Sequence, residues 1–472
     1  MIKINVSDEK LLDELTLVLK LFFDSEEIEN LNYEFNIEQN VVDLNIETKL
    51  TSNFDENEYV SNEKIIDSKF PERYKKRYAK LLLFDLLKKI KKDKNLPWGS
   101  LTGIRPTKLT YELTKECDGD YMKAFNMLTT KFGVSLEKAK IVKEIIKNQS
   151  FVIKNDNLVD LYINIPFCPS KCYYCSFISL PIDKCRDKLE PYLEALKKEI
   201  IETKKLIEKK NYLIKSIYIG GGTPTILSAS QLDDLLSLIN YKVSEFTVEC
   251  GRPDTITKEK LDVLSSHGVT RISINPQTFC NKTLKEIGRT HTSKDIMDAY
   301  KLALGYNFVI NMDLIAGLSC EKLSTFKKSV NTAIDYAPDN ITIHTLSVKR
   351  GSELKESNTQ TTNDLEVMKM VDYSYQKLTE AGYKPYYLYK QKNMIGNLEN
   401  IGYFKNNPSI FNIDSMEEFA SVIACGANAI SKRYYSINNK IERFANLKNI
   451  DEYINRIDEM IAKKAELFGS LS

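Results

Sequence analysis

Three closely spaced cysteines are the residues of this 472-residue sequence that most clearly could do chemistry. Cys168, Cys172 and Cys175 stand in FCPSKCYYCSF, a CxxxCxxC spacing that can wrap three thiolates around one inorganic centre. A structural zinc normally has a fourth Cys or His ligand nearby in sequence, and none is present. A disulfide would leave one thiol unused. A [4Fe–4S] cluster held by three thiolates fits the spacing and leaves one iron open to a ligand with its own donor groups.

The other six cysteines are scattered, and we expect them to be small buried hydrophobic residues. Polar residues, by contrast, follow several short apolar segments that lie C-terminal to the cysteines. The first such segment is followed by the Gly-rich turn GGGTPT at 220–225, whose glycines let the backbone approach a ligand closely. The polar residues at or just beyond the ends of later apolar segments are Glu249, Gln277, Arg289, His291 and Asp313. Each alone is equally well explained as a cap or a salt bridge, but together they indicate a site.

These residues need a scaffold, and from residue 159 short apolar runs alternate with amphipathic helical patterns. We expect strands at 161–165, 216–221, 245–251, 271–278, 309–318 and 340–348. Helices are expected between them, at 187–210, 230–240, 257–267, 293–305 and 322–335. Such alternation predicts an α/β fold with parallel strands and right-handed crossovers. Six units are too few for a closed eight-fold barrel, so we predict a partial (β/α)6 barrel with its site at the strand C-termini.

Four segments are predicted along the chain. Residues 1–60 form a small acidic α+β module, 61–150 a basic helical domain, 159–350 the partial barrel and 351–472 an α-rich C-terminal region. Within them we expect a strand at 2–6, helices at 9–23, 71–93, 107–117, 120–132, 136–148 and 364–382, a hairpin over 32–37 and 41–50, and an aromatic strand at 383–391. Residues 54–66 are acidic and polar and are predicted to be a linker.

Charge is distributed unevenly although the net charge is only +2. Residues 1–60 hold 4 Lys and Arg against 15 Asp and Glu, whereas residues 61–150 hold 21 against 11. The two segments could therefore pack together, or the basic one could face an anionic ligand, although most of these charges are expected to be solvated surface.

Composition narrows the class of protein. The start, MIKINVSDEKLLDEL, lacks the charged and apolar regions of a signal peptide, and no apolar run is long enough to span a bilayer. We therefore expect a cytoplasmic protein, in a reducing compartment where clustered Cys more often bind metal than form disulfides. The small net charge argues against a nucleic-acid-binding protein.

The cysteine motif, with Tyr174 before its third Cys, resembles the signature of radical S-adenosylmethionine (SAM) enzymes. The longer pattern YINIPFCPSKCYYCSF, IGGGTPT, SINPQTF, IGRTH and NMDLIAGL resembles the oxygen-independent coproporphyrinogen III oxidase family. Within it, LTGIRPTK, HTLSVKRGSEL and YYLYKQKNMIGNLENIGY look like the branch called coproporphyrinogen dehydrogenases. The resemblance covers residues 95–432.

The resemblance implies roles for the matching positions. The three cysteines would ligate a [4Fe–4S] cluster whose open iron is chelated by SAM, and Tyr162, Gly221 and Glu249 would contact that SAM. Positions matching the pocket of a second SAM are Tyr174, Gly222, Thr223, Gln277, Arg289, Asp313 and Ser347. The implied reaction, fed by a flavodoxin- or ferredoxin-type electron donor, uses a 5′-deoxyadenosyl radical to convert two propionates of coproporphyrinogen III into vinyl groups. The product would be protoporphyrinogen IX.

Two positions depart from the family pattern. Asn164 stands where the family usually has His, and Phe177 stands where the oxidase has a fourth Cys. Relatives without that Cys include haem chaperones, methyltransferases and haem-degrading enzymes. Methyl transfer, radical ring opening of a tetrapyrrole and haem binding without turnover are therefore alternatives to decarboxylation.

A substrate with four propionates needs cations. Arg105 and Lys108 in LTGIRPTK and Lys349 and Arg350 after the sixth strand are candidates, because Arg and Lys pair with carboxylates. We predict that the basic N-terminal region covers the barrel top as a partial lid. Equally, Arg105 could tie two domains together through a carboxylate.

The three histidines and a run of tyrosines are further candidates for site residues. His267, His291 and His344 are the only His, and capping or core roles are expected for them, with His344 alone placed to reach the cavity. Tyr386, Tyr387 and Tyr389 could stack on a macrocycle, but core packing is the commoner role of an aromatic strand.

Overall fold

The computed structural model describes residues 1–68, 70–175, 180–319, 321–347, 362–391, 394–437 and 440–469. It divides into two compact units. Unit 1 comprises residues 1–143 and 389–399, and unit 2 comprises residues 144–388 and 400–472. Within the described ranges, no helix is both long and apolar enough to cross a membrane.

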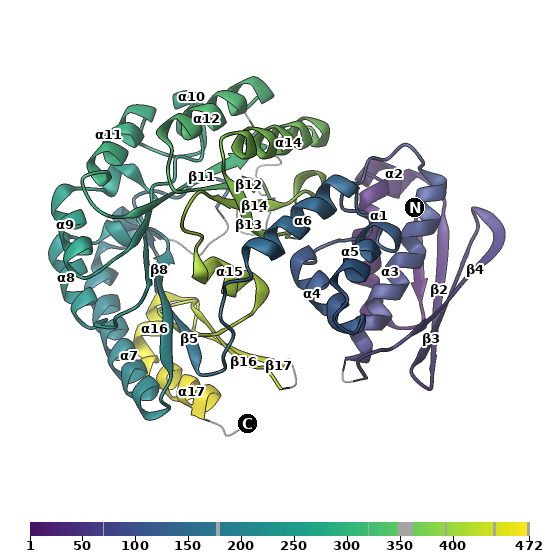
Figure 1. Ribbon diagram of the computed structural model, residues 1–472, viewed down its shortest axis with the longest axis horizontal. Coiled ribbons are helices and arrows are strands. Elements are labelled where there is room, and N and C mark those ends of the chain that lie inside the picture. Colours follow the sequence, from purple (N-terminus) through teal and green to yellow (C-terminus); the bar gives the residue numbers. More distant parts are fainter. Residues whose placement is uncertain are drawn as a thin grey trace. The chain divides into compact units, whose positions relative to one another are not determined.

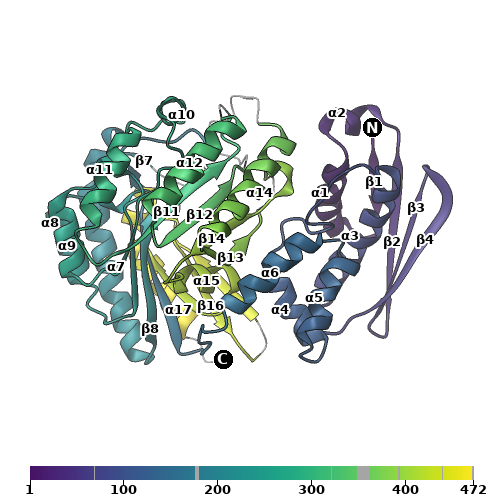
Figure 2. The same ribbon diagram turned by 45° about the horizontal axis from the view of Figure 1, so that its top comes forward.

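Unit 1 begins with a four-stranded sheet of order β1-β2-β3-β4. The strands are β1 (Lys3–Val6), β2 (Glu34–Val42), β3 (Asn45–Ser52) and β4 (Asp55–Lys64). Helices α1 (Leu12–Phe22) and α3 (Pro71–Ile90) cover one face of the sheet, and the short α2 (Ser25–Asn30) follows α1 (Figure 2). Their apolar positions build a core that includes Leu15, Phe22, Phe35 and Phe84.

The prediction of a linker over 54–66 is wrong, because residues 55–64 form β4. Its sequence, DENEYVSNEK, is polar along its length and gives little of the alternation that marks a half-buried strand. β4 pairs antiparallel with β3 at the edge of the sheet, where backbone hydrogen bonds hold a strand that buries little. It also crosses the predicted segment boundary between residues 60 and 61.

The helices predicted at 107–117, 120–132 and 136–148 are present. Helices α4 (Pro106–Glu116), α5 (Tyr121–Thr130) and α6 (Leu136–Asn148) follow α3, and α6 runs on into unit 2. The segment 389–399 belongs to unit 1 although it lies far along the chain. It is held by Glu399, which accepts hydrogen bonds from Trp98 Nε1 (2.6 Å) and Lys138 Nζ (2.7 Å). All three side chains are buried.

Unit 2 is built on an 11-stranded sheet that contains all six predicted βα strands (Figure 1). These strands are β5 (Leu158–Ile165), β8 (Leu213–Gly221), β9 (Glu245–Glu249), β10 (Arg271–Ser273), β11 (Val309–Ala316) and β12 (Asn340–Thr345). They are parallel and lie in the order β12-β11-β10-β9-β8-β5. The sheet of the described residues ends in β13 and β17 and does not close, which confirms the predicted partial barrel.

Helices form an outer layer over this sheet (Figure 1). They are α7 (Leu189–Lys209), α8 (Ala229–Ser237), α9 (Lys258–Ser266), α10 (Asn281–Glu286), α11 (Ser293–Ala303), α12 (Leu323–Tyr336) and α14 (Asp364–Glu380). Alternation along β5 shows how the faces divide. Leu161, Ile163 and Ile165 are buried in the core shared with α7, whereas Tyr162 and Asn164 alternate with them and belong to the opposite face.

The C-terminal region is predicted to be α-rich, but in the structure it also contributes several strands. β15 (Ser421–Cys425) adds a seventh parallel strand beside β5, and β16 (Ile430–Tyr435) and β17 (Lys440–Ala445) extend that edge. β13 (Lys384–Tyr389) and β14 (Asn400–Phe404) extend the other edge, where β14 pairs antiparallel with β12. The remaining helices are α15 (Ile410–Glu417), α16 (Ile450–Asn455) and α17 (Ile457–Gly469).

Candidate functional site

The cysteine motif forms a loop directly after the first parallel strand. Cys168 ends the short strand β6 (Phe167–Cys168), which pairs with β7 (Leu180–Pro181), and the Cys175 N–H donates to the carbonyl of Cys172 at 2.9 Å. Cys172 is buried, while Cys168 and Cys175 are partly exposed. The chain thus presents three cysteines that form no disulfide at the C-terminal end of β5, where a parallel sheet places its ligands.

The Gly-rich turn after β8 packs against this loop. Gly222 N–H donates to the carbonyl of Ile165, and Thr223 N–H donates to that of Phe167, both at 2.8 Å. A Cβ on Gly222 would lie 2.5 Å from the carbonyl oxygen of Phe167 and 3.0 Å from Cys168 Sγ. Only glycine fits so close to a backbone, so the turn and the cysteine loop form one tightly packed cradle. Thr223 Oγ1 lies 3.5 Å from the same sulfur.

The described residues contain no group of three or more His, Cys, Asp or Glu side chains that could hold a single metal ion. Thiolates of a [4Fe–4S] cluster each bind a different iron, so they need not converge on one point. Three cysteines outside any disulfide, two of them partly exposed, on a loop packed against the Gly-rich turn fit such a cluster.

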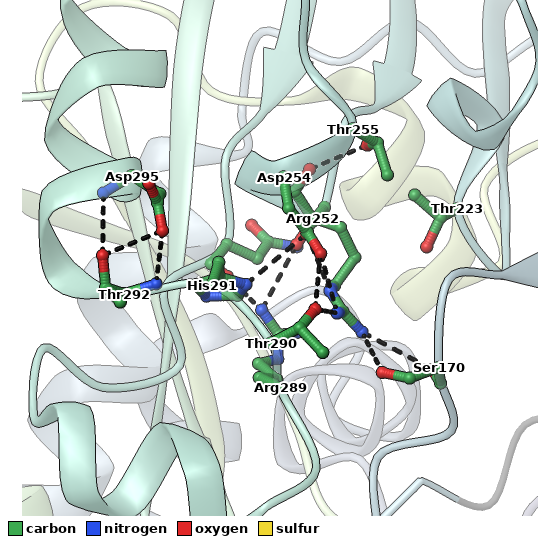
Figure 3. A network of polar contacts seen from close by, with 12 residues as sticks. Ser170, Thr223, Arg252, Asp254, Thr255, Arg289, Thr290, His291, Thr292 and Asp295 are labelled. Atoms are coloured by element: carbon green, nitrogen blue, oxygen red, sulfur yellow. Dashed lines mark hydrogen bonds and ion pairs between the residues drawn. The ribbon is translucent and has the colours of Figure 1, made fainter.

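A network of polar contacts braces the cysteine loop from the neighbouring strand ends (Figure 3). Arg252 donates to Ser170 Oγ on the loop at 3.0 Å, to Thr290 Oγ1 at 3.0 Å, and through Nε and Nη2 to the two oxygens of Asp254 at 3.1 Å. Asp254 also accepts from Thr290 at 2.8 Å and lies 3.6 Å from His291 Nδ1. Figure 3 shows these side chains converging from three segments, 170, 252–254 and 289–291.

The electrostatics of this network favour an ionised Asp254. Burial raises the pKa of Asp254, but the nearby His291, the hydrogen bonds from Arg252 and Thr290 and the charge of Arg252 outweigh it and hold that pKa well below its usual range. Burial also lowers the pKa of His291, which therefore favours the neutral ring. His291 therefore lies beside this network, and neither of its ring nitrogens has a hydrogen-bond partner among the described residues. Sequence analysis missed Arg252 and Asp254, although both stand in the ECGRPD segment that supplied Glu249.

Glu249 closes β9 beside the Gly-rich turn. It accepts a hydrogen bond from Tyr218 on β8, and its carboxylate oxygen lies 3.0 Å from where a Cβ on Gly220 would be. Burial raises the pKa of Glu249 to about 7, the Tyr218 hydrogen bond opposes the rise, and the nearby Asp313 adds to it. Because the pKa of this buried carboxyl group lies near neutral pH, a cationic partner such as an ammonium group would stabilise its ionised form.

Tyr162 lies in an aromatic stack with Tyr218, the residue that donates a hydrogen bond to Glu249. Its ring stacks on Tyr218 (centroids 6.2 Å apart) and on Phe411 (6.0 Å), and its hydroxyl donates to Asn164 Oδ1 at 3.0 Å. Asn164 also donates to the carbonyl of Ala427 at 2.7 Å. A Cβ on Gly221, whose φ is +106°, would lie 1.9 Å from Asn164 Oδ1. Asn164 therefore ties β5, the Gly-rich turn and the loop after β15 together.

Several buried polar atoms at this sheet edge have no hydrogen-bond partner in the described part of the chain. They are Asn275 Oδ1, Gln277 Oε1 and Arg289 Nε. Gln277 adopts a φ of +65°, a strained conformation for a non-glycine residue, and its backbone N–H donates to the backbone carbonyl of Asp313 at 2.8 Å. Buried polar groups are nearly always satisfied, so these atoms fit a polar ligand such as SAM.

Arg289 links this group to the cysteine loop. It donates to the carbonyl of Asn275 at 2.6 Å and to the hydroxyl of Tyr174 at 3.4 Å. Burial lowers the pKa of Arg289, but the nearby Tyr174 and Cys172 outweigh it and raise the pKa above its ordinary value. The structure therefore brings together Tyr174 and Arg289, two of the residues for which the family resemblance implies a role in a second SAM pocket.

Asp313 on β11 lies beside His344 on β12, with 3.5 Å between Asp313 Oδ2 and His344 Nε2. Asn311 donates to Asp313 Oδ1 at 2.8 Å. Burial raises the pKa of Asp313, but contacts with His344, Asn311 and Thr342 outweigh it and lower the value. Asp313 is thus an anion near Glu249, and Ser347 follows β12 in a half-buried position.

The remaining predicted residues lie outside this group. Lys349, Arg350 and Phe177 lie outside the described residues. Arg105 and Lys108 line a cavity within unit 1, and the lid over the barrel stays a prediction. Tyr386 and Tyr387 are buried and pack edge to face, as core residues. His267 ends α9 and pairs with Asp233 at 2.7 Å.

Comparisons with known proteins agree with the resemblance. The family model of the radical SAM superfamily matches residues 162–333. The oxygen-independent coproporphyrinogen-III oxidase-like protein HemZ of Bacillus subtilis strain 168 is 38% identical over 386 residues, which cover 78% of this chain and 76% of HemZ. The haem chaperone HemW of the same organism is 37% identical over 195 residues, 40% of this chain and 50% of HemW.

The fold comparison agrees with the partial barrel. Coproporphyrinogen III oxidase (HemN) from Escherichia coli, a radical SAM enzyme, matches with a TM-score of 0.51 and 20% identity. The match covers 64% of this chain and 70% of that one. At this identity the match establishes a shared fold.

Proposed function

We propose that this chain oxidatively decarboxylates coproporphyrinogen III. The chain belongs to the radical SAM superfamily and, within it, to the oxygen-independent coproporphyrinogen-III oxidase-like proteins. Each of two propionates would lose a hydrogen atom, CO2 and one further electron to become a vinyl group, giving protoporphyrinogen IX. The further electron passes to a one-electron acceptor.

Radical SAM proteins use a [4Fe–4S] cluster and SAM, which together supply the carbon-centred radical that removes a hydrogen atom from substrate. We propose that Cys168, Cys172 and Cys175 hold this cluster. The packing of the Gly-rich turn against Cys168 supports the proposal, because a side chain at Gly222 would clash with the Phe167 carbonyl and with Cys168 Sγ, so glycine keeps the turn in contact with the cysteine loop.

The chain's own residues then position SAM. Glu249 would face the cationic amino group of SAM, and the Tyr162 ring would lie on the β5 side of the bound SAM. Gln277 and Arg289 offer buried, unsatisfied atoms, and Asp313 adds a carboxylate; with Tyr174, Gly222, Thr223 and Ser347 they would line the second SAM pocket. Burial of these groups excludes water, which protects a reactive radical from side reactions.

The test is an anaerobic assay. Reconstituted protein is incubated with SAM, a low-potential reductant and coproporphyrinogen III, and the porphyrins are separated after oxidation. Tri- and dicarboxylic porphyrins are expected, with 5′-deoxyadenosine formed alongside. The Cys175→Ala variant is the control and should form neither product. S-adenosylhomocysteine as the main product would instead indicate methyl transfer.

Haem binding without turnover is the second candidate, because the HemW of Bacillus subtilis, described as a haem chaperone, is 37% identical over part of this chain. The presence of Phe177 in place of a fourth Cys also favours it. A stoichiometric haem complex seen by absorbance, in a protein that makes no decarboxylated porphyrin, would support the chaperone and contradict the oxidase.

A further inference from the structure

Helix α15 lies inside the curve of the unit 2 sheet, on the face opposite α7, α8 and α9 (Figure 1). It belongs to the C-terminal region, yet it is fastened to two strands of the barrel. Glu245, the first residue of β9, accepts hydrogen bonds from Ser409 Oγ and from the backbone N–H of Phe411, both at 2.9 Å. Asp414 of α15 pairs with Lys215 of β8 at 2.6 Å. Strands β8 and β9 therefore hold α15 at two points along its length.

The strands that anchor α15 also carry Tyr218 and Glu249. The Phe411 ring stacks on the Tyr218 ring, with the centroids 4.4 Å apart and the planes at 21°. The Tyr162 ring lies 6.2 Å from Tyr218 and 6.0 Å from Phe411, so the three rings form one stack. At the edge of this stack the Tyr218 hydroxyl donates to Glu249 Oε1. Because stacking fixes the plane of a ring, the stack determines where this hydroxyl points.

The Tyr218 hydroxyl is a lasting donor to Glu249. Burial and the charge of Glu249 raise the pKa of Tyr218 well above its ordinary value, so the phenol keeps its proton while Glu249 titrates. The hydroxyl occupies Oε1, whereas Oε2 lies 3.0 Å from where a Cβ on Gly220 would be. Tyr218 and Glu249 are both only partly buried, so the pair borders space that a ligand can enter.

We propose that Tyr218 is a positioning residue for SAM, because its hydroxyl holds Glu249 with one carboxylate oxygen turned toward the Gly-rich turn, and that α15 in turn holds Tyr218 through Phe411. The inference rests on the proposed function, since it takes Glu249 as the partner of the SAM amino group. A carboxylate that is already held in place has less freedom to lose when its ligand binds. A helix from outside the βα units thus becomes part of the SAM site.

Other titratable groups also face Glu249 and must stay unchanged in the test. Besides Tyr218 they are Asp313 on β11, His344 on β12, Tyr162 on β5 and the adjoining Cys250. Burial raises the pKa of Glu249 most, and the Tyr218 hydrogen bond is the strongest of the effects that lower it. Asp313 raises this pKa, whereas His344 lowers it. A change confined to the Tyr218 hydroxyl leaves all of these groups in place.

The first test needs no SAM. Tyr218→Phe removes the hydroxyl and keeps the ring in the stack, so the pKa of Glu249 should rise by about one unit, the effect of losing a hydrogen bond to a charged group. Infrared spectra of the cluster-loaded protein follow the protonated carboxyl as pH rises, and Glu249→Gln identifies its band. The matched control is Tyr383→Phe, which removes a buried hydroxyl that donates to the Pro338 carbonyl at 2.6 Å and should shift nothing.

The second test measures SAM affinity by equilibrium dialysis, with iron counted in each sample. In Tyr218→Phe the affinity should fall about fivefold near pH 7 and recover most of this loss by about pH 8.5, where the carboxyl ionises without help. Variant and wild type are compared at each pH, so the titration of SAM itself cancels. A residue that only supports the fold would lower the affinity by one factor at every pH.

The role of α15 is tested through Phe411. Phe411→Leu keeps an apolar side chain but has no ring plane, so it should shift the SAM profile in the same direction as Tyr218→Phe and by less. In the Tyr218→Phe background it should add no further shift, because the effect passes through Tyr218. Circular dichroism checks folding, and Phe411→Met replaces the variant if it is not folded. A further shift in the double variant would overturn the role of Phe411.

The outcomes separate this inference from the proposed function. Wild-type protein that carries its cluster but binds no SAM at any pH would contradict the proposed function, and this inference with it. Where the wild type binds SAM, an unchanged carboxyl titration and SAM profile in Tyr218→Phe would overturn this inference alone. A loss of affinity that does not depend on pH would overturn it as well.

Discussion

Glu249 is the residue whose protonation the fold controls most directly. Its raised pKa of about 7 means that the native state holds a proton that the unfolded chain, with a pKa near 4.5, has lost. The stability that this carboxyl contributes is therefore present at acid pH and falls as pH rises from about 4.5 to about 7. A cation bound to Glu249 would reverse this dependence of stability on pH, because the cation stabilises the ionised carboxylate.

We predict that SAM affinity rises between about pH 6 and pH 7.5, by up to about tenfold, as Glu249 ionises. Glu249→Gln should weaken SAM binding and flatten this pH profile while the cluster stays in place. Equilibrium dialysis of SAM across that pH range, with iron counted in each sample, measures both. An unchanged profile in the variant would show that Glu249 does not face the SAM amino group.

The cysteines give the second prediction at this scale. Replacing Cys168, Cys172 or Cys175 by Ala should abolish the iron–sulfur charge-transfer absorption, because a cluster with two protein thiolates is poorly held. Cys185→Ala and Cys250→Ala are the controls, since both thiols are buried in the core of unit 2. Iron and sulfide analysis of anaerobically purified protein decides it, and a triad variant with full iron content would contradict the assignment. Zinc in the wild-type protein would indicate a structural site.

At the scale of elements, the strands and helices that bury apolar residues were predictable from sequence. α7, α12 and the parallel strands agree with expectation to within a few residues, because burial against a sheet imposes a clear period. β4 was missed, as were the separate strands β16 and β17. β17 reads KIERFA and is only partly buried, so backbone pairing with β16 defines it more than its side chains do.

The candidate site, too, was only partly predictable from the sequence. The cysteines, Glu249, Gln277 and Arg289 were found because chemistry and spacing mark them in sequence. The brace of Arg252, Asp254 and Thr290 was not, because it joins three segments that only the fold brings together. No periodicity in the sequence encodes which strand end lies next to which.

The brace gives a prediction for the cysteine loop as an element. Asp254→Asn removes the charge that pairs with Arg252, a buried side chain, and should lower the free energy of unfolding by about 3 kcal/mol. The loop should also lose its cluster faster when iron is chelated. The matched control is Asp298→Asn, which breaks an exposed pair with Lys294 and should change stability by less than about 0.5 kcal/mol.

Chelator-driven bleaching of the cluster and chemical denaturation measure the two effects separately. Cluster loss at the wild-type rate, in a variant that is measurably destabilised, would mean that Arg252 supports the fold and not the loop.

At the scale of the whole molecule, unit 2 is completed by chain that returns from its C-terminal end. Glu199 on α7 is fully buried and accepts from Lys464 Nζ on α17 (2.6 Å), Tyr453 OH on α16 (2.6 Å) and Asn446 Nδ2 (2.8 Å). The Gly426 N–H after β15 donates to it as well, at 2.7 Å. One carboxylate thus joins four C-terminal segments to the helix that follows the cysteine loop.

This arrangement predicts that Glu199→Gln destabilises the molecule more than a surface change does. The substitution keeps the shape but leaves the Lys464 ammonium buried without its counter-charge, which costs about 3–5 kcal/mol. The double variant Glu199→Gln with Lys464→Met removes both charges and should recover most of that loss. Denaturant unfolding of the three proteins forms the cycle. Equal stability of the single variant and the wild-type protein would show that the C-terminal segments are held by apolar packing alone.

The same variants should differ in cluster content. Because β15 lies beside β5, which leads into the cysteine loop, we expect the single variant to retain less cluster and the double variant to regain it.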